Sequence, residues 1–363
     1  MCNSSGSSVE QMCNSSVSSV EQIYSSGSGV GHMRNSSGSS VEQIFVPVMD
    51  SLIWILGVTG QSLVMVILCG RQRRRRKRGG QPSQASTIGT GTDILLLALS
   101  AADLLLLSTV PFYSAAIAMR MWPFGDVMCR LVGFLGSACS SASIFTLATL
   151  AVSRYLTVVQ PTRAYGLLTP RKVSTIAALL WVPACCLGAP QLVFRFVKTL
   201  RGSPDRFVCL TFLSNEQRMI YGLFHFLAAF MLPLVTIALA YGSIYVFLWR
   251  GQQANTTPQV ERYQRKVTQT TAMLVLAFTV CWLPSYGLTL ALLANPHWAT
   301  AGATGATPRF GSFSVFARIM ATSSTVMNPI LYVLMSQKFR HDLRRIFKRD
   351  QQNGRSNVAL STV

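Results

Sequence analysis

The stretch TDILLLALSAADLLLLSTVPFYSAAI, residues 92–117, decides how this chain folds. Its two leucine-rich runs, Ile94–Leu97 and Leu104–Leu107, would cover every side of a helix, which no amphipathic helix of a water-soluble protein requires. An apolar segment of about 20 residues is long enough to cross the roughly 30 Å hydrocarbon core of a bilayer. We therefore interpret residues 92–117 as a membrane-spanning helix.

The rest of the chain repeats this pattern. Half of its 363 residues are hydrophobic and only 12% are charged, whereas soluble domains carry about 25% charged residues. Too few charged side chains are present to cover a water-facing surface. The sequence predicts an all-α fold, a seven-transmembrane helix bundle with a short amphipathic eighth helix. The spans are expected near residues 46–69, 92–117, 127–156, 173–194, 219–249, 267–293 and 312–335.

Basic residues flank the ends of these spans in four groups. The first connection contains the run Arg71–Arg78, and the other groups lie within Arg163–Lys172, Arg250–Lys266 and Lys338–Arg349. The positive-inside rule puts all four groups in the cytoplasm and the N-terminus outside, which requires an odd number of spans. The net charge of +20 then reflects topology and contacts with membrane lipids, and nucleic-acid binding is not expected.

Residues 1–44 form a tail of 11-residue repeats rich in serine and glycine. Such a sequence cannot bury a core, so we expect disorder. Three N-x-S glycosylation acceptors occur there, at Asn3, Asn14 and Asn35. No apolar run precedes residue 45, so the first span is expected to direct membrane insertion without a cleaved signal peptide. The other expected divisions are the transmembrane domain 45–336, helix eight 337–349 and a cytoplasmic tail 350–363.

Two cysteines outside the spans are informative. Cys129 opens the third span from the outer side, and Cys209 lies between the fourth and fifth spans. Both face the oxidising compartment, so a disulfide between them is plausible from their positions. The pairing of Cys2 and Cys13 stays open, and the cysteines inside spans are interpreted as packing residues.

Several polar side chains occupy positions that lipid or apolar neighbours would ordinarily surround. Asp103 lies in the middle of the second span, Arg154 at the cytoplasmic end of the third, and Asn328 and Tyr332 in the seventh. A charged residue at a helix centre costs about 2.5–3.5 kcal/mol on insertion scales, so such residues usually mark function. The alternative for each residue taken alone is that it only hydrogen-bonds one helix to another.

Motifs in successive segments support a common interpretation. They are Leu99-Ser100-Ala101-Ala102-Asp103, Trp122-Pro123-Phe124-Gly125, Ser153-Arg154-Tyr155, Trp181, Pro233 with Tyr241, Phe278-x-x-x-Trp282-x-Pro284, and Asn328-Pro329-Ile330-Leu331-Tyr332. This ordered set resembles the rhodopsin-like (class A) family of G protein-coupled receptors, over residues 45–350. Proline inside a helix removes a hydrogen bond and bends it, which would give the bundle hinges for two alternative packings.

The resemblance implies roles for particular residues. Its cytoplasmic partners would be a heterotrimeric G protein and arrestin, and a resemblance to galanin receptors within the family would imply the inhibitory Gi/o class. Apart from an allosteric sodium ion at Asp103, Ser143, Ser324 and Asn328, no cofactor is implied. The implied activation switch comprises Arg154, Tyr155, Tyr241, Phe278, Trp282, Pro284, Asn328, Pro329 and Tyr332.

Two absences narrow the ligand. Amine receptors of this family carry Asp at the position of Gly136, and opsins carry a Schiff-base Lys in a seventh span that here has none between Arg318 and Lys338. Arg154-Tyr155-Leu156 and Leu168-Thr169-Pro170-Arg171 resemble receptors of the galanin, allatostatin and kisspeptin group. The predicted function is therefore a receptor for an extracellular peptide. The alternative is an orphan class A receptor with constitutive signalling and no peptide ligand.

Candidate ligand-contacting residues lie near the outer ends of the spans. Arg318 needs an anionic partner, which a peptide carboxylate would supply, unless its side chain extends to the headgroups. His225 is either a packed residue or a ligand contact. The outer loop carries Arg195, Lys198, Arg201 and Arg206 against Asp205, which would attract acidic ligands. The full candidate set is Tyr113, Gln191, His225, Trp282, Tyr286 and Arg318.

The chain also departs from the family pattern. Gln61 stands where the family has Asn, which leaves the geometry of the Asp103 network open. Ser153 replaces the acid normally paired with the neighbouring Arg154, and Gln264 stands where an acid would otherwise restrain it. We therefore expect raised ligand-free signalling. The C-terminal Ser361-Thr362-Val363 matches a PDZ-domain ligand, although a three-residue match also arises by chance.

Other classes of membrane protein are not supported. No HExxH or GxSxG motif and no paired intramembrane aspartates occur, so an enzyme is not predicted. The inverted repeats with broken helices that are typical of transporters are not found in the sequence either.

Overall fold

The computed structural model describes residues 37–77, 84–200, 203–211, 215–251, 258–294, 311–335 and 339–345. Several sequence predictions lie outside these residues: Cys2, Cys13, the glycosylation sites Asn3, Asn14 and Asn35, the loop residue Arg201, the side chains of Asp205, Arg206 and Gln264, and the tail 350–363 with Ser361-Thr362-Val363.

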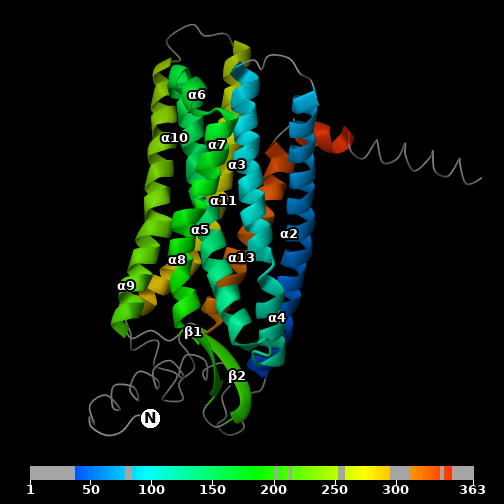
Figure 1. Ribbon diagram of the computed structural model, residues 1–363, viewed down its shortest axis with the longest axis vertical. Helices are drawn as coiled ribbons and strands as arrows, with labels where there is room; N and C mark the ends of the chain where they lie inside the picture. The colour runs from blue at the N-terminus through cyan, green and yellow to red at the C-terminus, as the bar shows by residue number, and fades with distance from the viewer. Residues whose placement is uncertain are drawn as a thin grey trace, which may run out of the picture.

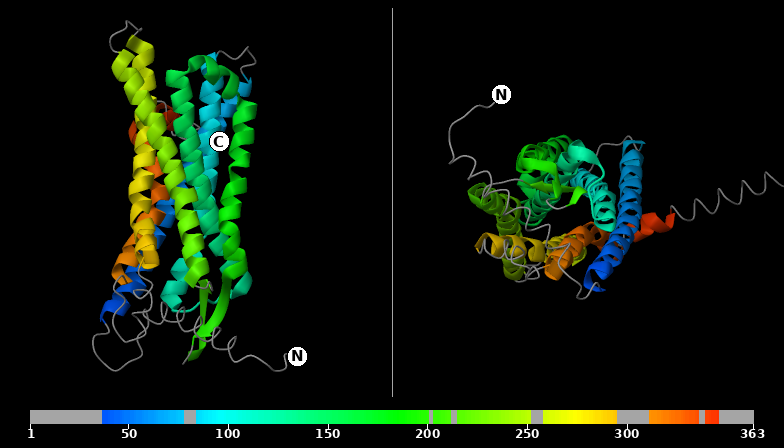
Figure 2. Two further views of the ribbon diagram at one scale, coloured as in Figure 1. Left: turned by 90° about the vertical axis from the view of Figure 1, so that its left-hand side faces the viewer. Right: turned by 90° about the horizontal axis from the view of Figure 1, so that it is seen from below.

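The helices lie side by side in one elongated bundle (Figures 1 and 2). Six of them are long and apolar enough to cross a membrane, and a seventh is counted when α13 is taken together with the bent segment Phe339–Arg345. The predicted seven-helix bundle is confirmed. Its elements are α2 (Ser37–Lys77), α3 (Gln84–Leu107), α4 (Val110–Met119), α5 (Gly125–Val159), α6 (Pro161–Leu167), α7 (Pro170–Leu179), α8 (Trp181–Phe194), α9 (Asn215–Phe226), η1 (Leu227–Met231), α10 (Leu232–Gly251), α11 (Pro258–Ala294) and α13 (Gly311–Met335).

Helix α2 is longer at both ends than the span expected at residues 46–69. It begins at Ser37, inside the stretch 1–44 that the sequence indicated as disordered, and continues to Lys77. Once a membrane helix has formed, adding a residue costs far less than starting a new helix. Arg, Lys and Gln favour helix, so the basic run after residue 69 continues α2 instead of ending it.

Three of the spans are interrupted: the second between α3 and α4, the fourth at Leu180 between α7 and α8, and the fifth at η1. Helices α3 and α4 are separated at Ser108 and Thr109, shortly before Pro111, which has no N–H to donate. The Thr109 hydroxyl donates to the Leu106 carbonyl at 2.7 Å. In the fifth span, the π-helix η1 ends two residues before Pro233, whereas Pro284 and Pro329 lie inside α11 and α13, which continue through them. The wider turn of η1 is of the kind that often occurs at functional sites.

A hairpin covers one end of the bundle, which we call the hairpin end; the opposite end, where α6 lies, is the α6 end (Figure 1). Strand β1 (Arg195–Leu200) pairs antiparallel with β2 (Ser203–Thr211), with Val197 opposite Cys209. The predicted Cys129–Cys209 disulfide is present, with a Cα–Cα separation of 5.7 Å, and it fastens β2 to α5. The hairpin is therefore fixed to the bundle it covers.

The buried core follows α5. In its apolar window 67% of the residues are buried inside the protein, against 22% for α11, so α5 is the central helix. Leu147 and Leu150 of α5 pack with Leu95 and Leu99 of α3. Large apolar side chains such as Leu239 are exposed on the outer face of the bundle, where lipid would cover them.

Candidate functional site

A cavity of about 880 Å³ lies toward the hairpin end, inside the bundle. It is lined by residues of α3, α4, α5, α8, α9, α11 and α13 and reaches the hairpin at Arg195, Leu210 and Thr211. Its volume lies within the range of about 300–1,000 Å³ that is usual for small-ligand sites. All six candidate residues from the sequence line it: Tyr113, Gln191, His225, Trp282, Tyr286 and Arg318.

An aromatic column leads from this cavity into the core. Phe278, Trp282 and Tyr286 follow one another at intervals of one turn on α11, so their rings lie along one face of the helix. The ring centroids of Phe278 and Trp282 are 5.6 Å apart, and those of Trp282 and Tyr286 are 6.1 Å apart. Trp282 and Tyr286 line the cavity, whereas Phe278 belongs to the main core. The column therefore connects the cavity wall to packed core residues.

His225 combines the two roles left open by the sequence. Its ring lies 6.1 Å from that of Tyr286, and its Nε2 is 3.2 Å from the Ser137 hydroxyl. The side chain is therefore packed between α5 and α11 while it also forms part of the cavity wall.

Arg318 has a partner that sequence reasoning missed. Its Nη1 lies 3.0 Å from Oδ2 of Asp50 on α2, and the Asp50 side chain is 0% exposed. The sequence predicted that Arg318 would either bind a ligand carboxylate or extend to the lipid headgroups. Asp50 provides a counter-ion within the protein instead. The signal was present, because Asp50 is an ionisable residue inside the expected span 46–69.

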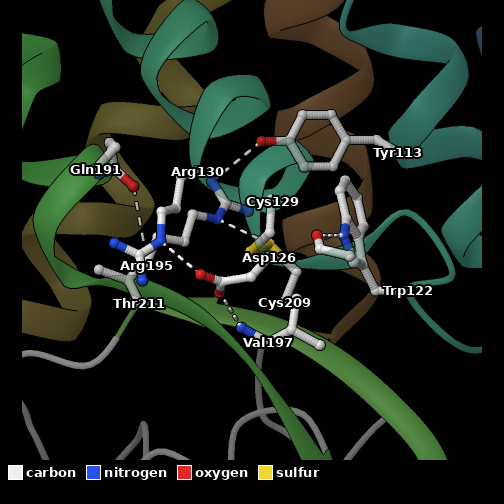
Figure 3. The surroundings of a disulfide bond; sticks show 11 residues. Tyr113, Trp122, Asp126, Cys129, Arg130, Gln191, Arg195, Val197, Cys209 and Thr211 are labelled. Carbon is white, nitrogen blue, oxygen red and sulfur yellow. Dashed lines mark hydrogen bonds and ion pairs between the residues drawn. A yellow bond between two sulfur atoms is a disulfide. The ribbon is translucent and has the colours of Figure 1, made fainter.

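Two arginines flank the disulfide at the hairpin end (Figure 3). Arg130 pairs with Asp126 at 2.7 Å and also donates to the Leu192 carbonyl at 3.1 Å. Arg195 donates through Nη1 to the Tyr113 hydroxyl at 3.1 Å, and its Nε lies 3.1 Å from the Cys209 sulfur. Of the two, only Arg195 lines the cavity.

A polar network joins four helices in the middle of the bundle. The buried Asp103 carboxylate accepts hydrogen bonds from Gln61 Nε2 at 2.7 Å, Ser143 Oγ at 2.9 Å and Asn328 Nδ2 at 2.6 Å. The longer amide of Gln61 therefore reaches the network, and it also donates to the Thr325 carbonyl at 2.7 Å. Asp103, Ser143 and Asn328 are brought together as the sequence suggested.

Ser324 is oriented away from the predicted sodium set. Its hydroxyl donates to the Ala321 carbonyl at 2.7 Å and accepts from Trp282 Nε1 at 3.2 Å. It joins the aromatic column to α13 and does not contact Asp103 in this arrangement. The buried Gln61 Oε1 has no hydrogen-bond partner among the described residues. Carboxylate, hydroxyl and amide oxygens at this place fit a small hard cation.

Arg154 occupies the α6 end of α5 and is mostly buried. Its Nη2 donates to the Thr92 hydroxyl of α3 at 2.9 Å, while the Ser153 hydroxyl donates to the Leu150 carbonyl at 2.7 Å. The neighbouring Tyr155 hydroxyl accepts from Gln160 at 3.0 Å. Thr92 was not anticipated, because a threonine inside a helix carries no distinctive sequence signal.

Tyr241 and Tyr332, the other residues of the implied switch, are also placed by the structure. Both hydroxyl groups are buried, and that of Tyr332 has no hydrogen-bond partner among the described residues. The Tyr332 ring lies 6.0 Å from that of Phe339 in the segment Phe339–Arg345. Both side chains can thus form new hydrogen bonds if the helices move apart.

An ion-pair cluster at the same end was also missed. Arg71 Nε lies 2.6 Å from Asp342 Oδ2, and Arg75 Nη1 lies 3.1 Å from Asp93 Oδ2. A longer contact of 3.6 Å joins Arg71 to Asp93. The start of the basic run therefore connects α2 to α3 and to the segment Phe339–Arg345, in addition to the topological role expected from its charge.

Comparisons with known proteins agree with this geometry. The family described as 7 transmembrane receptor (rhodopsin family) matches residues 83–332. Galanin receptor type 3 of Mus musculus is 31% identical over 307 residues, which cover 83% of this chain and 78% of the relative. Galanin receptor type 2 of Rattus norvegicus is 29% identical over 303 residues, 83% and 75% of the two chains, and galanin receptor type 1 of Homo sapiens is 28% identical over 302 residues, 83% and 81%. The chain is therefore a multi-pass membrane receptor, not an enzyme, and belongs to the rhodopsin family of seven-transmembrane receptors.

Proposed function

We propose that this receptor binds an extracellular peptide and activates a heterotrimeric G protein. The observation that carries the proposal is the continuous path from the cavity, through Trp282 and Phe278, to the buried core of the bundle. The hairpin end would face outside and the α6 end the cytoplasm, because the basic residues Arg71, Arg74 and Arg75 lie at the α6 end.

The cavity wall favours a peptide over a small amine. Gly136 lines the cavity where an amine receptor would present a carboxylate, and a Cβ added there would meet nothing within 4 Å. Arginines line the cavity at three positions: Arg195, Arg218 and Arg318. The relatives named galanin receptors support a peptide as the occupant.

The mechanism follows from the contacts. A peptide that presses on Tyr286 and Trp282 would move α11 about Pro284 and break the hydrogen bond from Trp282 to Ser324. Helix α13 would then shift relative to Asp103. When bound at Asp103, a sodium ion would neutralise the carboxylate and favour the resting arrangement. The Asp103, Ser143 and Gln61 oxygens are the groups of this chain that would hold it.

At the α6 end the shift would release Arg154 from Thr92 and open a surface for the G protein, which Tyr241 and Tyr332 would line. By similarity, Gi/o is the first G protein to test. Arrestin would compete for the same surface, and membrane lipids would surround the exposed apolar side chains.

The test is a panel of galanin-, allatostatin- and kisspeptin-type peptides applied to cells that express the full chain, with GTP exchange as the readout. We expect one peptide class to activate the receptor and Trp282→Ala to abolish the response. Trp249→Ala is the matched control, because Trp249 is 69% exposed and does not line the cavity. A panel without any response would contradict a peptide ligand of these three classes.

A second candidate, an orphan receptor with constitutive signalling, is favoured by one observation. Arg154 donates to the neutral Thr92 hydroxyl, and Ser153 supplies no carboxylate. Two results together would select this alternative: no peptide of the panel activates the receptor, and basal GTP exchange exceeds that of an Arg154→Ala variant.

A further inference from the structure

Three arginines line the cavity, Arg195, Arg218 and Arg318, and the protein balances the charges of Arg195 and Arg318 differently. Arg318 is paired with Asp50 at 3.0 Å. Among the residues that the structure describes, no carboxylate forms an ion pair with Arg195, whose polar partners are the Tyr113 hydroxyl and the Cys209 sulfur. A guanidinium with neutral partners in a cavity wall retains its capacity to bind an anion.

Arg130 lies in the same region, and a carboxylate of the protein balances its charge. It lies one residue after Cys129, and Asp126 holds its guanidinium at 2.7 Å (Figure 3). Its guanidinium also lies 4.4 Å from the centroid of the Phe196 ring. Arg130 therefore differs from Arg195 in two properties that matter for binding an anion: a carboxylate already neutralises its charge, and it does not line the cavity.

The local fold makes room for Arg195 and fixes its position. A Cβ on Gly133 would lie 2.5 Å from Arg195 Nη1 and 2.8 Å from its Cδ, so only glycine leaves space for this side chain. Arg195 also begins strand β1, which is held through the hairpin to the Cys129–Cys209 disulfide. The guanidinium is thus positioned before any ligand arrives, which reduces the entropy lost on binding.

We propose that Arg195 is the carboxylate-binding residue of the cavity, with the Tyr113 hydroxyl as a second donor. The Tyr113 oxygen accepts from Arg195, which leaves its O–H free to donate to the same anion. The carboxylate is either the C-terminus of a peptide or an Asp or Glu side chain. This assignment rests on the proposed peptide function for the identity of the occupant. It replaces Arg318, whose charge Asp50 balances at 3.0 Å, although Arg318 Nη2 has no hydrogen-bond partner among the described residues.

A test of the electrostatics needs no agonist. A Gly136→Cys substitution places a thiol in the cavity, where a Cβ meets nothing within 4 Å. The full chain in membranes is treated with anionic methanethiosulfonate ethylsulfonate or its cationic trimethylammonium analogue, and chains without Gly136→Cys correct for other cysteines. Adding Arg195→Gln should lower the anionic-to-cationic rate ratio about fivefold, Arg195→Lys should preserve it, and Arg130→Gln should change it less than about twofold.

An unchanged ratio in the Arg195→Gln chain, or an equal fall in the Arg130→Gln chain, would overturn the assignment. If the ratio falls as expected while no peptide activates the receptor, the anion site stands and the peptide function fails. The two proposals are therefore separable.

A second experiment uses the unaltered receptor and distinguishes the two sources of carboxylate. Three synthetic octapeptide pools are incubated with the purified full chain, and retained peptides are quantified by mass spectrometry. One pool has a free C-terminus without Asp or Glu, one has a C-terminal amide with a single Glu, and one has an amide without acid. One acidic pool should be retained about tenfold over the uncharged pool. Equal retention of all three pools would overturn the proposal. Because this experiment needs no variant, its result holds even when the Arg195→Gln chain does not fold.

Discussion

The middle of the bundle and the cavity toward the hairpin end contain buried charges with different kinds of partner. In the middle, Asp103 accepts hydrogen bonds from Gln61, Ser143 and Asn328, so helices α2, α5 and α13 meet at one carboxylate on α3. In the cavity, Arg195 has only neutral polar partners. The difference indicates which charges hold the fold together and which are left for a partner molecule. Substituting charged or polar groups of each kind tests this division between charges that the fold pairs and charges that it leaves with neutral partners.

The largest effect is expected at the Asp50–Arg318 pair. Arg318→Ala would leave a carboxylate that is 0% exposed without its counter-ion, at a cost of about 3–5 kcal/mol of folding stability. Thermal unfolding of the purified receptor measures the loss. The double variant Asp50→Asn with Arg318→Gln should recover most of it, since no buried charge remains. A double variant as unstable as Arg318→Ala would contradict the pairing.

Removing one donor from the Asp103 network should have the next largest effect. Gln61→Ala deletes the hydrogen bonds to Asp103 and to the Thr325 carbonyl, and we expect a loss of about 1.5–3 kcal/mol. Thr59→Ala on the same helix is the control, because the Thr59 hydroxyl bonds only to carbonyls of its own helix at an exposed position. Equal melting temperatures for the two variants would show that Gln61 does not support the network.

A smaller effect is expected on basal signalling. Ser153→Asp would place a carboxylate beside Arg154 and add to the restraint from Thr92, so ligand-free GTP exchange should fall about two- to tenfold. Thr92→Val should change exchange in the opposite direction. Equal basal exchange in the parent and Ser153→Asp chains would remove the idea that the missing acid raises activity.

The smallest effect is expected at the surface of the ion-pair cluster. Arg74 lies 3.9 Å from Asp342, and its side chain is 43% exposed, so Arg74→Gln should cost less than about 1 kcal/mol. Arg71→Gln should cost more, because the Arg71 side chain is only 11% exposed and contacts Asp342 at 2.6 Å. Melting curves of the two variants compare them, and the reverse order would contradict the burial argument.

The sequence predicted much of this arrangement because lipid imposes simple rules on it. The length of the apolar runs located the spans, and the expense of polar groups in lipid identified Asp103 and Asn328. The inward-facing candidates Tyr113, Gln191 and Tyr286 all line the cavity.

The rest depends on how the helices rotate and slide against one another, which a single sequence does not specify. Whether Asp50 meets Arg318 is decided by the rotation of α2 against α13, since the two residues are far apart in the chain. The same holds for Ser324, which is turned toward Trp282 instead of Asp103. The pairing of the α2 arginines Arg71 and Arg75 with Asp342 and Asp93 likewise depends on how α2 lies against α3 and the segment Phe339–Arg345.

The most direct measurement compares the melting temperatures of Arg195→Gln and Arg318→Gln in purified receptor without any peptide. Arg195 is left for a ligand, so its loss should leave the melting temperature within about one degree of the parent, because no carboxylate of the fold depends on it. Arg318 neutralises the buried Asp50, so its loss should lower the melting temperature by several degrees. An equal fall in both variants would contradict the division between charges that stabilise the fold and charges that bind a partner.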